Sequence, residues 1–153
     1  MKQTSQIIQK VDAIYQWLET ELASLNPSCT ACGKCCDFES FGHRLYLTTP
    51  ELLYFQHHVG PDIQPMTTGV CPYRVDGQCR VYPCRFASCR IFTCKGDTDT
   101  EHRICEETIR AFKDLCDQYR LDYQYVSLQA GLAMLRQGTF QLTTPTFNQE
   151  RIQ

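Results

Sequence analysis

Four cysteines stand within eight residues of this chain, in the run Cys29-Thr30-Ala31-Cys32-Gly33-Lys34-Cys35-Cys36. Two residues between two cysteines let the backbone fold back, so that both thiolates can reach one metal ion. A second step of the same length brings three thiolates round one centre, as in the proteins that hold three irons of a cubane iron–sulfur cluster. Adjacent residues rarely ligate one metal in the same way, so Cys36 bridges metals, serves a second centre or acts as a redox partner. The run predicts a loop organised by metal.

The cysteine count separates metal chemistry from disulfide chemistry. The chain has 153 residues and 11 cysteines, and an odd number argues against a closed disulfide framework. Its first residues lead into an amphipathic pattern and not into an apolar signal sequence, so we expect a cytoplasmic protein. In a reducing compartment, a high density of cysteine indicates metal or redox chemistry.

Five further cysteines follow in a segment without helical or strand periodicity. They are Cys71, Cys79, Cys84, Cys89 and Cys94. Four arginines are interleaved with them, and we expect these to form a cationic shell around thiolates: Arg74, Arg80, Arg85 and Arg90. We expect irregular structure over 61–97, with a small hairpin turning at Asp76-Gly77.

Charge and hydropathy exclude two classes of partner. The net charge is -2, which gives no electrostatic reason to expect nucleic-acid binding. No stretch approaches the roughly 20 apolar residues that a membrane-spanning helix needs. We therefore expect neither nucleic acid nor membrane as a partner, and we expect a metal ion or cluster with a possible protein partner.

The remaining pattern predicts a mainly α fold. Apolar residues recur at helical spacing in two long segments, and start and stop signals mark two shorter helices. Thr49 as N-cap, followed by Pro50 and Glu51, begins a helix that ends near Gly60, and Gly138 lies at the C-terminal end of the other. The ranges are about 5–25, 50–59, 99–119 and 126–137. We expect one small domain over 1–138, in which the long helices pack together and clamp irregular cysteine-rich loops. Its metal-binding core spans about 28–95, and 139–153 form a polar tail.

Two cysteines and the histidines are better explained without a metal. Cys105 and Cys116 lie on the apolar stripe of the helix at 99–119, so we assign both to the core. His57 and His58 end a helix, where a positive charge suits the dipole. His43 is the best candidate ligand among the histidines, although a structural role fits it better.

The cysteine pattern resembles the C-x-x-C-x-x-C-C family of zinc- or iron-chelating domains. The family's hallmark corresponds to residues 29–36, with Gly33 at the usual glycine. A later family block, C-x-I-Y followed by R-P and C-R, corresponds to Cys79-Arg80-Val81-Tyr82, then Arg85, then Cys89-Arg90. The family's proline is Phe86 here, and Cys84 is an additional cysteine. Cys71-Pro72-Tyr73 resembles the family's C-P-aromatic step. The resemblance covers about 28–95.

The resemblance implies eight ligand positions, namely Cys29, Cys32, Cys35, Cys36, Cys71, Cys79, Cys89 and Cys94. Eight thiolates exceed the four that one tetrahedral zinc ion needs. They suit a cluster with bridging ligands, two four-cysteine sites, or one site with spare thiols. Both an iron–sulfur cluster and zinc fit this set, and the repeated C-x-x-C step slightly favours iron–sulfur.

Three functions are compatible with such a set. The leading hypothesis is a metal-cluster protein in electron transfer, redox sensing or metal handling. The second is a structural zinc module that mediates a protein–protein interaction. The third is an enzyme, either a thiol oxidoreductase or a cluster-dependent catalyst, and the chain shows no motif of a substrate pocket that would define its catalytic residues. Some members of the family have been labelled flagellin lysine methylases, but no Gly-rich nucleotide loop follows a strand in this chain.

Overall fold

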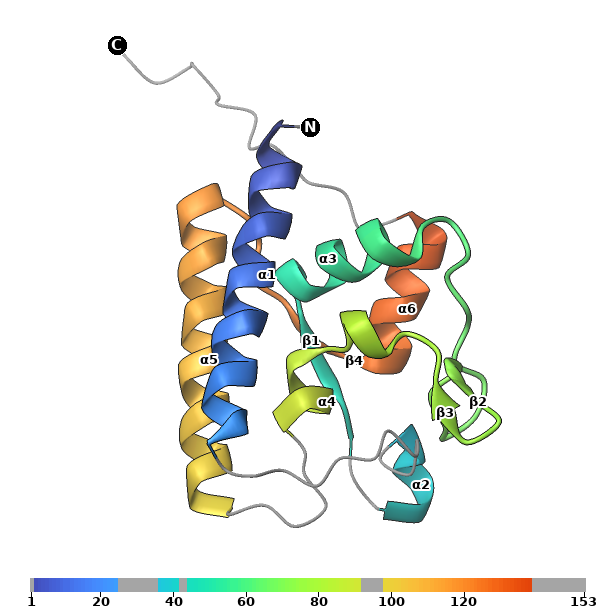
Figure 1. Cartoon of the computed structure of the whole chain (residues 1–153). Helices are drawn as coiled ribbons and strands as arrows, with labels where there is room; N and C mark the ends of the chain where they lie inside the picture. Colours follow the sequence, from blue (N-terminus) through green and yellow to red (C-terminus); the bar gives the residue numbers. More distant parts are fainter. Residues whose placement is uncertain (1, 25–35, 42–43, 92–97, 139–153) are drawn as a thin grey trace.

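Two long antiparallel helices form one side of the molecule in the computed structural model (Figure 1). The structure describes residues 2–24, 36–41, 44–91 and 98–138. Helix α1 spans Lys2–Ala23 and helix α5 spans Thr98–Tyr119. The Gln3 amide donates to the Tyr119 carbonyl oxygen (3.0 Å) at one end of the pair. At the other end, Arg103 lies 3.7 Å from a carboxylate oxygen of Glu21. Both long helices, and their packing against each other, were predicted.

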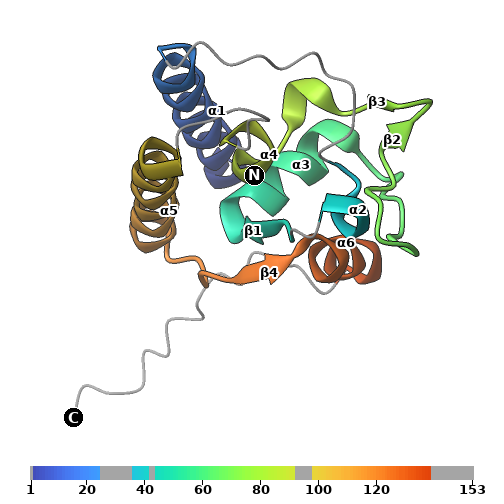
Figure 2. The ribbon, with the colours of Figure 1, turned by 90° about the horizontal axis from the view of Figure 1, so that it is seen from below.

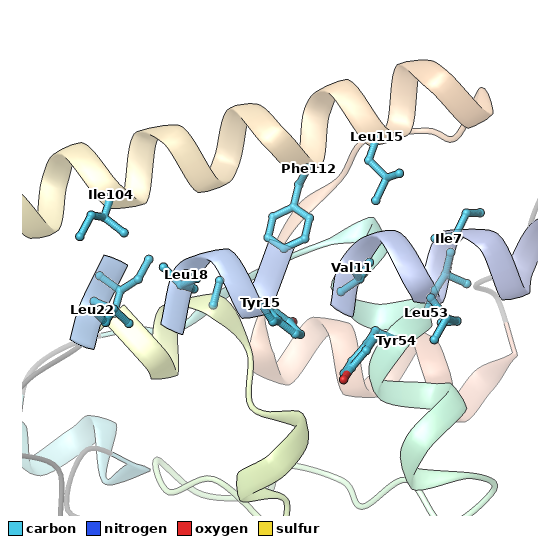
Figure 3. Close-up of a cluster of buried hydrophobic side chains, with 13 residues drawn as sticks. Ile7, Val11, Tyr15, Leu18, Leu22, Leu53, Tyr54, Ile104, Phe112 and Leu115 are labelled. Atoms are coloured by element: carbon cyan, nitrogen blue, oxygen red, sulfur yellow. The ribbon is translucent and has the colours of Figure 1, made fainter. Parts of the chain in front are cut away.

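An apolar stripe on each helix fills the space between α1 and α5, and we call this the first core. Ile7, Val11 and Leu18 of α1 are fully buried, and they face Ile104 and Phe112 of α5 (Figure 3). Burying a side chain of this size contributes about 1.5–3 kcal/mol. The stripe predicted from sequence spacing is therefore what holds the helix pair together.

Two short strands carry the second half of the fold. Strand β1 (Tyr46–Thr48) pairs antiparallel with strand β4 (Tyr125–Ser127), with Tyr46 opposite Ser127. Each strand continues directly into a helix, β1 into α3 (Thr49–Val59) and β4 into α6 (Leu128–Gln137). Figure 2 shows α6 on the other side of α3 from the long helices, with β4 running between α5 and α6. The buried residues of this half form the second core: Leu45, Leu47, Leu52, Phe55, Ile63, Tyr73, Phe86, Leu128, Leu132 and Leu135.

Helix ends follow local capping chemistry, with one correction. The N-cap of α3 is Thr48 and not Thr49, because a capping box joins the Thr48 hydroxyl and backbone N–H to the Glu51 carboxylate. Helix α6 begins at Leu128, with the Ser127 hydroxyl accepting a hydrogen bond from the Ala130 N–H. Gly138 ends it in the left-handed conformation at φ 65°, as its position predicted.

The described part of the cysteine-rich segment contains more regular structure than its sequence predicts. The hairpin of β2 (Arg74–Val75) and β3 (Gln78–Cys79) turns at Asp76 and Gly77, which have φ values of 53° and 72°. That conformation is typical of a two-residue hairpin turn, and the prediction is confirmed. Three short helices were not predicted: α2 (Phe38–Phe41), the 3-10 helix η2 (Tyr82–Cys84) and α4 (Ala87–Ile91).

The fold class is mainly α, as predicted, with two small two-stranded sheets among the described residues. None of the helices that the structure describes is long and apolar enough to cross a membrane. The predicted polar tail at 139–153 lies outside the described residues.

Candidate metal centre

The eight predicted ligands divide evenly between described and undescribed residues. Cys36, Cys71, Cys79 and Cys89 are described, and Cys36 is buried while the other three are partly buried. The predicted ligands Cys29, Cys32, Cys35 and Cys94 lie outside the described residues. The same holds for His43. Half of the predicted ligand set can therefore be placed.

Backbone pairing joins the end of the first cysteine run to the start of the second. The Cys71 N–H donates to the Cys36 carbonyl oxygen (2.9 Å), and Asp37 forms an antiparallel bridge with Val70. The Phe38 N–H continues the pairing with the Gly69 carbonyl oxygen (3.0 Å). Two cysteines that are 35 positions apart by residue number consequently lie on adjacent backbone segments.

The hairpin brings a third predicted ligand close to the same place. The Arg74 N–H donates to the Cys71 carbonyl oxygen (3.1 Å), and Arg74 is paired with Cys79 across β2 and β3. The Arg80 N–H donates to the Tyr73 carbonyl oxygen (2.9 Å) and closes the base of the hairpin. Cys36 and Cys71 are thus linked by a backbone hydrogen bond, and strand pairing places Cys79 opposite Arg74, which is bonded to Cys71.

Arg74 stands at the junction of these segments and has an unusual environment. Its guanidinium lies 3.9 Å from the Asp37 carboxylate, with about a quarter of each side chain exposed. Its Nε atom is buried and has no hydrogen-bond partner among the residues that the structure describes. An unsatisfied buried donor costs about 1–3 kcal/mol, so native proteins rarely leave one. The buried Nε–H of Arg74 therefore needs a hydrogen-bond acceptor next to the cysteine segments.

Cys84 and Cys89 lie on the side of this region that faces the cores. Cys84 packs against both cores and Cys89 against the second core. Burial raises the pKa of the Cys84 thiol, and the charge on a Cys79 thiolate raises it further.

The described residues do not form a metal site by themselves. Within 2–24, 36–41, 44–91 and 98–138, no three His, Cys, Asp or Glu side chains are arranged to hold a metal ion. A thiolate site here would thus need ligands from the remaining cysteines of the predicted set. Thiolates are soft donors that suit zinc and iron–sulfur clusters, so the donor chemistry fits both groups.

Arg90, predicted as part of a cationic shell around thiolates, favours the Cys84 thiolate by lowering the pKa of that thiol, and it also has partners on α1. Its Nη1 atom donates to the Glu19 carboxylate (2.8 Å), and its Nε atom donates to the Arg85 carbonyl oxygen (2.8 Å). Its guanidinium also lies 4.1 Å from the centre of the Tyr15 ring. Arg90 therefore fastens α4 to α1, a role for which its sequence context gives no signal.

A buried carboxylate, which was predicted only as a helix-start residue, holds three segments together. Glu51 is 2% exposed and accepts hydrogen bonds from the Ala87 N–H (2.7 Å) and the Tyr15 hydroxyl (3.2 Å). Its other oxygen accepts from the Thr48 N–H and hydroxyl, both at 2.9 Å. Because Ala87 begins α4, Glu51 fixes the start of the helix that carries Cys89.

The two cysteines assigned to the core lie there. Cys116 is 1% exposed, and burial raises the pKa of its thiol to about 11. Cys105 is partly buried against the first core, and burial also raises the pKa of its thiol. A raised pKa disfavours the thiolate form of a thiol, which agrees with the assignment of both cysteines to the core.

Comparisons with known proteins found no matching protein-family model, no matching curated protein and no matching solved structure.

Proposed function

We propose that this protein binds a metal centre through thiolates of both cysteine blocks, with an iron–sulfur cluster favoured over zinc. The observation that carries the proposal is the backbone pairing of Cys36 with Cys71, continued by the pairing of Arg74 with Cys79. It joins two cysteine groups that are distant in the sequence. A chain that used its cysteines separately would not need that junction.

The buried Nε–H of Arg74 is a second, independent support. Thiolate sulfur and cluster sulfide are both hydrogen-bond acceptors, and such contacts tune the affinity and the potential of a metal site. An acceptor of that kind would satisfy the one buried side-chain donor for which no partner is found among the described residues. The Asp37 carboxylate, 3.9 Å away, sets the position of the guanidinium.

The resemblance to the C-x-x-C-x-x-C-C family agrees with this proposal. We take the ligands from the set Cys29, Cys32, Cys35, Cys36, Cys71, Cys79, Cys89 and Cys94. Such a centre would serve electron transfer, redox sensing or metal handling, with the arginine donor tuning its potential. A redox-silent zinc site would instead support a structural module that presents the loops to a protein partner.

The first experiment is anaerobic purification of the full chain, followed by metal, acid-labile sulfide and visible absorption analysis of one sample. We expect brown protein with iron and sulfide in near-equal amounts. Colourless protein with stoichiometric zinc and no sulfide would support the structural zinc module in place of the iron–sulfur centre. Protein that takes up neither metal after reconstitution under reducing conditions would refute it.

A pair of variants separates ligands from core cysteines. Cys71→Ser removes a predicted ligand at the junction and should lose most of the metal. Cys116→Ser changes a buried thiol of α5 and should keep the metal while lowering stability. Equal metal content in both variants would contradict the ligand assignment.

A further inference from the structure

The outer face of the long helix pair has an apolar groove that no described element covers. The groove has a volume of about 420 Å³ and lies between α1 and α5. Its apolar lining consists of Ala13, Ile14 and Trp17 from α1 and Ala111 and Leu115 from α5. The two long helices form an edge of the molecule in both views (Figures 1 and 2). Small residues on both helices let another helix approach closely.

Charged residues bound the groove in a regular order. Lys10 from α1, and Glu107 and Asp114 from α5, line it together with the apolar residues. The two helices are antiparallel, and the contacts of Gln3 with Tyr119 and of Glu21 with Arg103 fix their relative register. Because both helices rise equally per residue, Lys10 lies level with Asp114 across the groove, and Trp17 lies level with Glu107.

The arrangement of these charges fits a second copy of the chain, related to the first by a two-fold axis. A second copy placed by a two-fold axis parallel to the helices would set α1 against the partner's α5 at the same level. Lys10 would then meet the partner's Asp114, and this pair would occur twice in the interface. A two-fold axis perpendicular to the helices would instead bring Glu107 towards the partner's Asp114, placing like charges together. The charges therefore distinguish between the two symmetric arrangements.

The charges that would form these pairs are available. Neither Lys10 nor Asp114 makes an ion pair with any residue in the described ranges. Further along the groove, Glu21 and Arg103 already attract each other within one copy, and the same symmetry would set each opposite the other across the interface. In this arrangement each helix is antiparallel to both of its neighbours, as in an up-and-down four-helix bundle.

We propose that α1 and α5 form the interface of a homodimer, in which the two grooves close on each other about a two-fold axis parallel to the helices. The inference is independent of the metal centre. It predicts that Trp17, the single tryptophan of the chain, is more exposed in the monomer than in the dimer.

The test is a charge exchange measured by sedimentation velocity over a series of protein concentrations. Lys10→Glu and Asp114→Lys should each weaken dimerisation, by about tenfold in dissociation constant, because each places like charges together twice. The double variant restores opposite charges and should recover dimerisation. Asp117→Lys makes the same charge change on an exposed position of α5 outside the groove lining and should dimerise like the unmodified chain.

Tryptophan fluorescence gives a second readout on the same samples. Emission from Trp17 should shift to the red when the unmodified chain is diluted and its dimer dissociates. In the single variants the same shift should occur at a higher protein concentration, because their dimers are weaker. A chain that is monomeric at every concentration would overturn the proposal. A dimer that tolerates both single reversals, or that the double variant fails to restore, would overturn this interface. Circular dichroism of each variant verifies that the helices are intact.

Discussion

Truncation of Glu51 is the sharpest test of how the fold holds the cysteine-rich segment. The carboxylate is 2% exposed and accepts four hydrogen bonds, two of them from the backbone N–H groups of Thr48 and Ala87. Glu51→Ala leaves both N–H groups buried without an acceptor, at about 1–3 kcal/mol each. The variant no longer has to bury a carboxylate, and this gain offsets part of the loss in stability. We expect the free energy of unfolding to fall by about 4 kcal/mol.

The isosteric variant refines this prediction. Glu51→Gln keeps one acceptor oxygen and the volume of the side chain, so it should cost only about 1–2 kcal/mol. Urea unfolding of the metal-free, reduced protein, followed by circular dichroism, measures both losses under one condition. Hydrogen exchange at Ala87 and along α4 should accelerate more than exchange in α1. A loss below about 1 kcal/mol for Glu51→Ala would refute the proposed role of the carboxylate.

Three further perturbations have defined outcomes. Burial raises the pKa of Glu51 above its ordinary value of 4.5, so its contribution to stability is complete below pH 4.5 and is lost as pH rises through the raised pKa. The difference in unfolding free energy between the unmodified chain and Glu51→Gln should therefore shrink with rising pH across that window, and a difference that grows would contradict it. Arg74→Gln should weaken metal retention by about 10–100-fold in a chelator competition, and unchanged retention would remove the arginine from the site. Gly131→Ala should lower the free energy of unfolding by about 1 kcal/mol despite its better helix propensity. Its Cβ atom would stand 3.1 Å from Leu47 and 3.0 Å from Leu52 in the second core, and a rise in the urea midpoint would show that these side chains can move away.

The helices were predictable because their signals are local. Apolar residues at helical spacing located α1 and α5, and Gly60 and Gly138 marked helix ends through their positive φ. The N-cap of α3 was placed one residue late, because Thr48 and Thr49 are chemically alike. Only the contact with the Glu51 carboxylate distinguishes them.

The rest of the fold depends on contacts between distant residues, which local patterns do not encode. Strand β4 forms because β1 is available as a partner, and α4 begins where Glu51 accepts the Ala87 N–H. The contacts of Arg90 with Glu19 and Tyr15 are equally distant in the sequence, so they could not be predicted, whereas its effect on the pKa of the nearby Cys84 thiol agrees with the prediction.

For the candidate site, the residue types in the sequence indicated the kind of chemistry. They did not indicate which segments pair with one another in the fold. The resemblance to the C-x-x-C-x-x-C-C family predicts Cys36, Cys71 and Cys79 as members of one ligand set. The hydrogen bond between Cys36 and Cys71, and the buried Nε of Arg74, could come only from the structure. The placement of Cys105 and Cys116 on the apolar side of α5 was predicted correctly, because both follow the apolar period of a helix.

The pairing of β1 with β4 has a consequence for how the chain acquires its fold. Tyr46 and Ser127 are 81 positions apart by residue number, so this contact closes a long loop, and such closures slow folding. During synthesis, Leu47 and Leu52 leave the ribosome well before α6 exists to cover them. A nascent chain that stalls after α5 would lack Leu128, Leu132 and Leu135, so the residues that α6 covers in the second core would be exposed to chaperones and to other chains. The last strand and helix therefore complete the second core late, and damage to them should reduce the yield of folded protein.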